Sequence, residues 1–259
     1  MKYGLIIDPI KDTDYVLGGA VQLKGVVLQP DGDWSGFLPE TEIQDKNKIE
    51  PYACVPFATN NCIEILEKFT YTCRNNWSDR FLAKMSGTKE RMGNTPANVA
   101  ETRRKKGNVK EEEWGFDTSI DTFEKYYADI PQAIQILAIG EGAAYDFGYE
   151  AVPSNAKAIM EALKYSPVLF SVYAWVKDEN GMFYRPFGYT DNHATCVYGY
   201  EEGKYWKCFD SYLDDGMIIK QIRWDALPMM CYRYTLSRQV VVESWWTKFL
   251  KGLKELLGL

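Results

Sequence analysis

The sequence has a single histidine, and its cysteines include no pair in the Cys-x-x-Cys spacing. The cysteines stand at positions 54, 62, 73, 196, 208 and 231. Structural zinc sites use regularly spaced cysteines and histidines, and disulfide scaffolds pack many cysteines into a short chain. Neither pattern is present, so we expect reduced, mostly buried thiols, with no metal and no organic cofactor.

The chain also lacks a strong charge of one sign and a long apolar run. Its formal net charge is -6, with acidic and basic residues scattered along the chain. This distribution does not attract a polyphosphate backbone, so nucleic acid is not an expected partner. No run reaches the length of a membrane span, and Asp8, Lys11 and Asp12 interrupt the first apolar patch, unlike a signal peptide. We expect a cytoplasmic protein.

Apolar and aromatic residues are abundant, at 46% and 15% of 259 residues, and one main domain at residues 1–238 accounts for them. Residues 3–43 predict extended segments and loops. Helical periods follow in residues 54–72, in "TPANVAETRRKKG" and in "PSNAKAIMEALKYSP", while residues 108–130 predict a surface connection. After Pro167, segments rich in Val, Ile and aromatic residues predict an antiparallel sheet. Helices followed by strands indicate an α+β fold with two sub-lobes and a cleft.

Cys54 lies in "PYACVPFATNN", directly before the first helical period. Apolar residues recur at three- and four-residue steps from Val55 to Phe69, and Pro56 suits a first helical turn. A thiol at this place lies beside the positive end of the helix dipole, which favours a thiolate. Its position alone does not separate a nucleophile from a buried structural thiol, which is the commoner case.

His193 is the only histidine that a cysteine nucleophile could use as a base. It stands in "YTDNHATCVYGY", at the entry to an apolar strand. An imidazole in this role needs an acceptor to orient it, and Asp210 in the next strand, "YWKCFDSY", is placed for this by hairpin pairing. The chain order is then Cys, His, Asp.

Three segments resemble the motifs of the papain-like cysteine peptidases, in the same order. "CVPFATNNCIE" keeps the nucleophile Cys54, followed by Phe57 and Glu64 at matching steps. "NHATCVYGY" resembles the histidine segment around His193. "YWKCFDSY" resembles the third segment, with Asp210 where the family has Asn and Tyr212 where it has Trp.

The resemblance implies a two-lobed fold, with the nucleophile helix in an N-terminal helical lobe and an antiparallel C-terminal β lobe. It implies hydrolysis of peptide bonds in a peptide or protein substrate through a thioester acyl-enzyme, with Cys54, His193 and Asp210 as the triad. Gln44 would supply the oxyanion hole across a loop, residues 45–53, that is longer than in the family. No inhibitory segment is recognisable ahead of Asp33. The compact form is similar to that of cysteine peptidases encoded by bacteriophages, which would place the chain in the host cytoplasm or the virion.

Other activities use the same order of catalytic residues. They include amide hydrolases acting on cell-wall peptides and transglutaminase-type acyl transferases, and the triad alone does not separate these from a peptidase. A catalytically silent binding or assembly module is a further alternative, favoured by the unusual spacing of Gln44.

Residues 239–259 predict an amphipathic helix at the C-terminus. Within 241–259, Trp and Leu side chains share one side and Lys248, Lys251 and Lys254 lie on or near the other. This pattern suits a membrane surface or the groove of a partner protein, and it equally suits packing on the chain's own domain.

Overall fold

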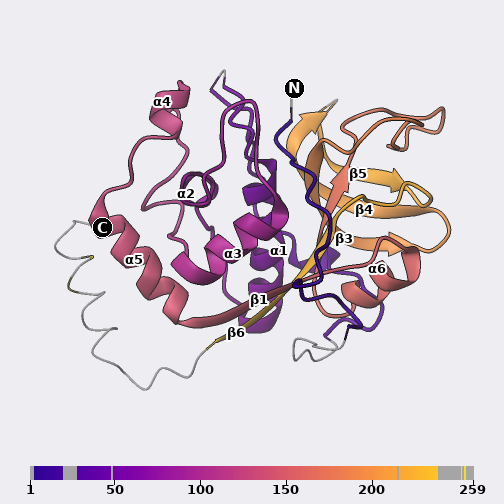
Figure 1. Ribbon diagram of the computed structural model, residues 1–259, viewed down its shortest axis with the longest axis horizontal. Coiled ribbons are helices and arrows are strands. Elements are labelled where there is room, and N and C mark those ends of the chain that lie inside the picture. The colour runs from indigo at the N-terminus through magenta and orange to yellow at the C-terminus, as the bar shows by residue number, and fades with distance from the viewer. Residues whose placement is uncertain are drawn as a thin grey trace.

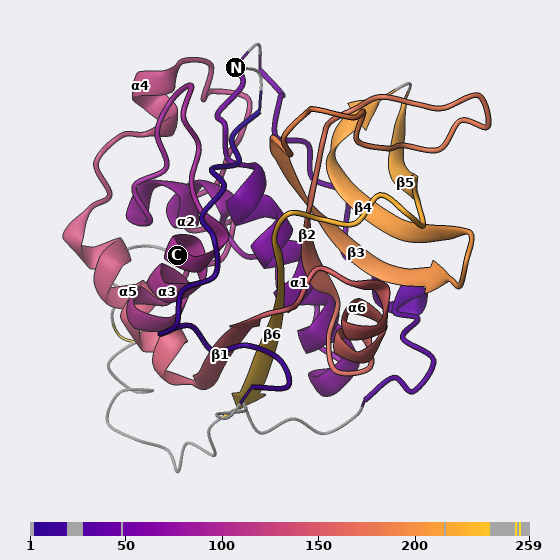
Figure 2. The same cartoon turned by 45° about the vertical axis from the view of Figure 1, so that its right-hand side comes forward.

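Helix α1, Cys54–Tyr71, lies between a group of helices and a β-sheet (Figures 1 and 2). The computed structural model describes residues 3–19, 28–47, 49–214, 216–238, 252 and 254. The residues of α1 from Cys54 to Glu67 are all buried, which is expected of a helix packed on every side. Its polar groups find partners inside: Glu64 Oε1 accepts from the Trp77 N–H at 2.7 Å.

The helical lobe is built from α1 and four further helices. The N-terminus of α3 is capped as its sequence predicts, because the Thr95 side chain accepts a hydrogen bond from the Asn98 N–H and Gly107 follows the last turn. The bounds are α2 Asp79–Met85, α3 Pro96–Lys106, α4 Phe123–Tyr126 and α5 Gln132–Ala143, with a short 3-10 turn, η1, at Ser35–Phe37.

The second lobe is a sheet of six antiparallel strands in the order β1-β6-β2-β3-β4-β5. Helix α6, Ala156–Leu163, begins after the cap Asn155 and covers β2, β3 and β6. The strands are β1 Tyr145–Ala151, β2 Val168–Val172, β3 His193–Glu201, β4 Tyr205–Asp214, β5 Met217–Arg223 and β6 Cys231–Arg238. The arrangement is α+β, as the sequence predicts.

The prediction of a surface connection at residues 108–130 is wrong for part of that segment. Phe116 and Tyr126 are buried together in the helical lobe. The guanidinium of Arg80 explains how the segment is held inside, because it donates to the carbonyls of Tyr126 at 2.9 Å and Gly115 at 3.0 Å. The segment therefore forms part of the core around α2.

The predicted C-terminal helix at 239–259 lies outside the described residues, apart from Gly252 and Lys254, which are both helical. Lys254 Nζ lies 2.7 Å from Glu113 Oε1 and 3.3 Å from Glu141 Oε1 in the helical lobe. A role of this segment at a membrane or partner stays a prediction. Of the helices in the described part of the chain, none is both long enough and apolar enough to cross a bilayer.

Candidate active site

Cys54 is the first residue of α1 and is completely buried. No side chain caps this helix, so its first N–H groups are not satisfied by a capping hydrogen bond. The turn into the helix passes through Tyr52 at φ 59°, a left-handed conformation that costs a non-glycine residue about 1–2 kcal/mol. The Tyr52 N–H donates to Glu50 Oε1 at 2.8 Å, which holds this strained turn in place.

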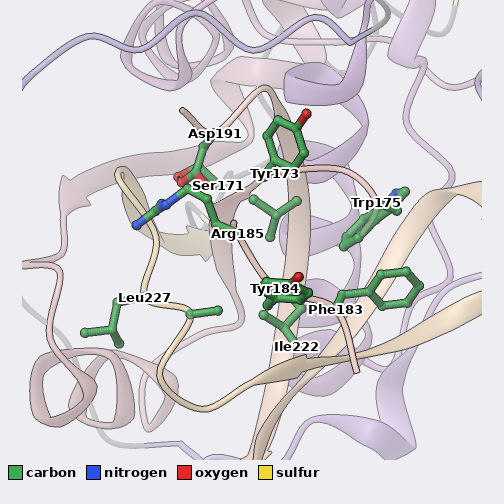
Figure 3. Close-up of a pocket in the computed structure, with 11 residues that line it drawn as sticks. Ser171, Tyr173, Trp175, Phe183, Tyr184, Arg185, Asp191, Ile222 and Leu227 are labelled. Atoms are coloured by element: carbon green, nitrogen blue, oxygen red, sulfur yellow. Dashed lines mark hydrogen bonds and ion pairs between the residues drawn. The ribbon is translucent and has the colours of Figure 1, made fainter. Parts of the chain in front are cut away.

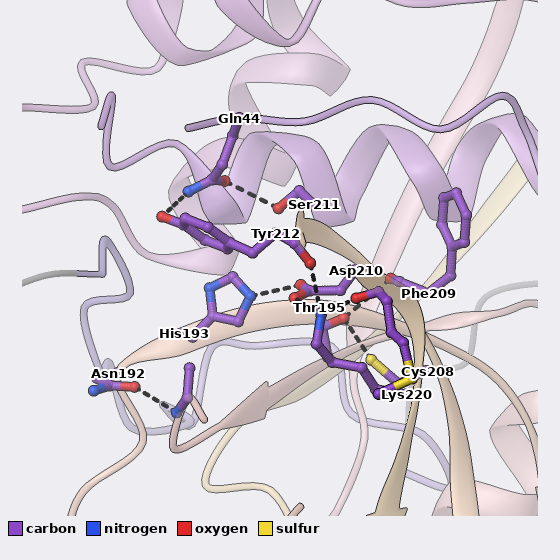
Figure 4. Close-up of polar contacts among 12 residues, drawn as sticks. Gln44, Asn192, His193, Thr195, Cys208, Phe209, Asp210, Ser211, Tyr212 and Lys220 are labelled. Carbon is purple, nitrogen blue, oxygen red and sulfur yellow. Dashed lines mark hydrogen bonds and ion pairs between the residues drawn. The ribbon is translucent and has the colours of Figure 1, made fainter. Parts of the chain in front are cut away.

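His193 is the first residue of β3, and Asp210 lies on the neighbouring strand β4. The register pairs Cys196 with Phe209, so His193 and Asp210 both fall on the opposite face of the sheet from that pair. His193 Nε2 lies 2.7 Å from Asp210 Oδ1, and both side chains are fully buried (Figure 4). Nδ1 of the imidazole has no hydrogen-bond partner among the described residues. This ring nitrogen is therefore free to exchange a proton with a thiol.

The buried charges set the protonation of the pair. Burial opposes the imidazolium, but the charge and hydrogen bond of Asp210, together with the Cys54 side chain, outweigh it and raise the pKa of His193 to about 9. Burial likewise opposes ionisation of Asp210, yet His193 and Lys220 lower its pKa below the usual value. A protonated His193 beside an ionised Asp210 follows at neutral pH.

A small pocket is lined in part by Arg185 and Asp191, which belong to the loop that precedes His193 (Figure 3). Buried Asp191 accepts hydrogen bonds from Arg185 Nη1 and Ser171 Oγ, each at 2.6 Å, and from the Met229 N–H at 2.8 Å. The next residue, Asn192, accepts from the Ala174 N–H at 2.9 Å. The carboxylate of Asp191 is thus satisfied by the protein itself, and the pocket serves to fix the backbone before His193.

Three aromatic rings surround His193. The ring centroids of Tyr212, Trp175 and Tyr3 lie 5.0, 5.4 and 5.5 Å from that of the imidazole. Tyr212 is the residue that stands where the papain-like family has Trp, whereas no sequence pattern indicates Trp175 or Tyr3. Together they keep water away from the imidazole, which strengthens its interaction with Asp210.

Gln44 reaches the same region and is fully buried. Its side-chain amide donates to the Tyr212 hydroxyl, and its carbonyl accepts from Ser211 Oγ at 3.0 Å (Figure 4). The same amide also donates to Glu50 Oε1 at 3.1 Å. Both N–H groups of the amide are therefore engaged by Glu50 and Tyr212. Burial raises the pKa of Glu50 above its usual value, against the hydrogen bonds from Tyr212 and the Tyr52 N–H.

The N-terminal segment, residues 3–9, crosses between the lobes beside these residues, as the dark trace from the N-terminus shows in Figures 1 and 2. The N–H of Leu5 donates to the carbonyl of Asn192, next to His193, at 3.2 Å. On the other side, Asn94 accepts from the Ile6 N–H at 2.8 Å and donates to the Gly4 carbonyl at 2.9 Å. The segment is thus bonded to both lobes, and Tyr3 packs against His193 and Tyr212.

Loosening this segment is expected to expose Cys54. Tyr3→Ala removes two ring contacts worth about 0.5–1.5 kcal/mol each, so the population with the segment detached should rise about 5- to 150-fold. The rate of Cys54 alkylation by iodoacetamide, followed by intact and peptide mass, should rise by the same factor.

A glycine pair supplies the control for this experiment. A Cβ added at Gly4 would lie 2.0 Å from the Tyr52 carbonyl oxygen, so Gly4→Ala should also displace the segment. Gly36 has no atom within 4 Å of an added Cβ, so Gly36→Ala should label like the wild type. An unchanged rate in folded Tyr3→Ala and Gly4→Ala would show that the reagent reaches Cys54 with the segment in place.

The other thiols lie in environments that suit structural roles. Cys62 Sγ lies 3.5 Å from Cys196 Sγ inside the core, and all six cysteines are free. Burial raises the pKa of Cys62, Cys208 and Cys231. Among the described residues, no group of His, Cys, Asp and Glu is arranged to hold a metal ion.

Comparison with known proteins agrees with this geometry at the level of fold. Neither a family model nor a curated protein matches the chain. Procathepsin L 3 from the larval midgut of Tenebrio molitor superposes with a TM-score of 0.58 at 14% identity, over 78% of this chain and 68% of its own. Bromelain from Ananas comosus gives 0.57 at 20% identity, over 79% of this chain and 98% of its own. A cysteine protease of Carica candamarcensis gives 0.57 at 17%, over 78% and 96%.

The fold is papain-like. The resemblance read from three short motifs is therefore confirmed for the architecture, including the helical lobe that carries α1 and the antiparallel lobe that carries His193. At these identities the likeness concerns the papain-like fold, and the roles of Cys54, His193, Asp210 and Gln44 depend on the geometry described above. The similarity to bacteriophage-encoded peptidases stays a prediction.

Proposed function

We propose that this chain is a cysteine peptidase, with Cys54 as nucleophile, His193 as general acid and base, and Asp210 as the group that orients the imidazole. One observation carries the proposal: His193 bonds Asp210 through Nε2 at 2.7 Å, and its imidazole also interacts with the side chain of Cys54 at the N-terminus of α1, which contributes to the raised pKa of His193. That the similar solved structures are cysteine proteases supports the same chemistry.

In the first half-reaction the Cys54 thiolate attacks the carbonyl carbon of the scissile peptide bond. The negative charge that develops on the carbonyl oxygen is held by the Cys54 backbone N–H and the Gln44 amide. Protonated His193 then gives its proton from Nδ1 to the leaving amine as the C–N bond breaks. The products are the free amine and a thioester between the acyl group and Cys54.

In the second half-reaction water resolves the thioester. Neutral His193 takes a proton from the water, the hydroxide equivalent adds to the thioester carbonyl, and the C–S bond breaks to release a carboxylic acid and the thiolate. Asp210 keeps the imidazole in the tautomer that has Nδ1 free and stabilises its positive charge in both steps. Binding of a substrate requires the N-terminal segment to move, because Cys54 and His193 are fully buried.

Three substrates separate the peptidase from the alternatives on the same triad. The protein is incubated with denatured casein, with purified peptidoglycan sacculi, and with casein plus a primary amine, and the products are identified by mass. We expect shortened casein peptides with free carboxyl termini, and none after Cys54 has been alkylated. Cell-wall fragments alone would identify an amidase, and amine-linked casein an acyl transferase. Inactivity on all three by folded protein would indicate a binding module.

A further inference from the structure

Lys220 on β5 is buried beneath the candidate triad, and its side chain is completely shielded from solvent. Its ammonium donates to Asp210 Oδ2 at 2.8 Å and to the Tyr212 carbonyl at 2.6 Å (Figure 4). It also donates to the Met217 carbonyl at 3.0 Å. These contacts use all three N–H donors of a lysine. The charge also lies 5.0 Å from the centroid of the Trp175 ring, which is close enough for a cation–π interaction.

A bulge in β4 makes this arrangement possible. The β4–β5 ladder pairs Phe209 with Ile219 and then Asp214 with Met217, so residues 210–213 of β4 face only Ile218 of β5. Extra residues in a bulge leave backbone groups unpaired and re-aim side chains. The bulge presents Asp210 and Tyr212 to His193, and it frees the Tyr212 carbonyl, which Lys220 satisfies.

The two oxygens of the Asp210 carboxylate are therefore divided between two cationic groups. Oδ1 lies 2.7 Å from His193 Nε2, and Oδ2 lies 2.8 Å from Lys220 Nζ. This division prevents rotation of the carboxylate away from the imidazole. It also balances charge, because a thiolate, an imidazolium, a carboxylate and an ammonium sum to zero in a buried site where excess charge is costly.

We propose that Lys220 is a positioning residue of the active site, which fixes the Asp210 carboxylate on His193 and neutralises the charge that an aspartate adds there. The proposal rests on the peptidase function proposed above. Lys220 does not touch the reacting atoms, since it acts through Asp210. Asp210 and Lys220 are then a matched pair, and each requires the other.

Other groups face the His193–Asp210 pair and stay unchanged in the test. They come from every element packed against it, and are Cys54 on α1, Glu50 in the preceding loop, Tyr212 and Cys208 on β4, and Tyr3 of the N-terminal segment. Changing only Asp210 and Lys220 therefore isolates their mutual dependence.

The test compares Asp210→Asn with the double variant Asp210→Asn/Lys220→Met. Asp210→Asn alone leaves an unpaired ammonium beside the imidazole, so casein hydrolysis should fall about 100-fold or more, the scale of a positioned acid–base group. The double variant removes that charge, and its rate of casein hydrolysis should recover to within about 10-fold of the wild type. Replacing both members of a buried ion pair by neutral side chains is tolerated, whereas removing one member leaves an uncompensated charge. Lys207→Met is the matched control, because Lys207 lies on β4 of the same sheet and pairs with a different aspartate, Asp33.

A pH profile separates positioning from a purely structural role. Hydrolysis needs the imidazolium as acid, so the wild-type rate should fall as pH rises through about 9, the pKa of His193. The midpoint of this alkaline limb should shift to lower pH in both variants, by the larger amount in Asp210→Asn and by less in the double variant. The proposal would be overturned if the two variants had the same midpoint of the alkaline limb and the same rate of casein hydrolysis. It would also be overturned if the double variant failed to fold. A double variant that folds where Asp210→Asn does not would support it.

Alkylation of Cys54 keeps this result distinct from the proposed function. If the wild type cleaves no substrate, the peptidase proposal fails. The pH dependence of Cys54 labelling still reports the coupling of His193 to Asp210 and Lys220. Its midpoint pH should be highest in the wild type, lower in the double variant and lowest in Asp210→Asn.

Discussion

The Cys54→Ala and His193→Ala variants are each expected to lose at least about 10⁴-fold in kcat/KM on denatured casein. Alanine at 54 removes the atom that forms the thioester, and alanine at 193 removes both the proton donor for the leaving amine and the only imidazole in the chain. Because the two groups act as a unit, the double variant should be no slower than either single variant. Release of casein peptides, followed by mass spectrometry over hours, measures the loss.

Labelling distinguishes the two variants and supplies the control. In the wild type one cysteine should react with a mild thiol electrophile ahead of the other five, and peptide mass should place it at Cys54. In His193→Ala that preference should disappear. Cys73 is only partly buried, so Cys73→Ala tests whether accessibility alone directs the reagent. Cleavage that survives in Cys54→Ala or His193→Ala would remove these residues from the mechanism.

The parts of the site that could be predicted from sequence lie on regular elements. The start of α1 at Cys54 follows from its helical period and Pro56, and the structure begins the helix at that residue. His193 and Asp210 lie on consecutive strands, so hairpin pairing brings them together. In each case a local pattern determines the backbone, and the backbone places the side chain.

The residues that were missed owe their positions to contacts distant in sequence. Lys220 stands in "MIIKQIR", where strand alternation puts it on the same face as Ile218 and Ile222, but no local pattern indicates partners for a buried ammonium, and the bulge in β4 supplies them. Tyr3 is placed by backbone hydrogen bonds from residues 4–6 to Asn94 and Asn192. No short-range sequence pattern predicts such contacts between residues that are distant in the sequence.

Residues 131–151 received no prediction for a related reason. Helix α5 has Gly140 and Gly142 near its end, which weakens the helical pattern. Strand β1 mixes apolar and charged residues, and its partner strand in the sheet is β6, more than 80 residues later. Its place at the edge of the sheet comes from that partner, which the local sequence does not indicate.

Gln44 was expected to supply the oxyanion hole across the long loop 45–53, and the structure places its amide among Glu50, Tyr212 and Ser211. The loop explains this placement, since it carries Glu50 back to the amide before the turn at Tyr52. For catalysis one of the amide N–H groups must leave its present acceptor for the developing oxyanion. Glu50 is the acceptor that substrate would displace more readily, because its bond to the amide is 3.1 Å long.

Gln44→Met keeps the size of the side chain and removes its donors, and it is expected to lower kcat on casein about 10²- to 10³-fold with a small change in KM. The reason is that the lost hydrogen bond forms mainly in the transition state. Thermal unfolding should be measured alongside the kinetics, because Gln44 is buried and the substitution removes its hydrogen bonds to Glu50 and Ser211.

Glu50→Gln is the matched control, because it preserves an oxygen acceptor for the Gln44 amide and removes a carboxylate beside the developing negative charge. Its kcat should equal or exceed that of the wild type. A fall in kcat like that expected of Gln44→Met would mean that the charge of Glu50 itself is needed. If Gln44→Met is folded and keeps full kcat, the amide belongs to the framework that Glu50 and Ser211 complete. The Cys54 backbone N–H would then hold the oxyanion without Gln44.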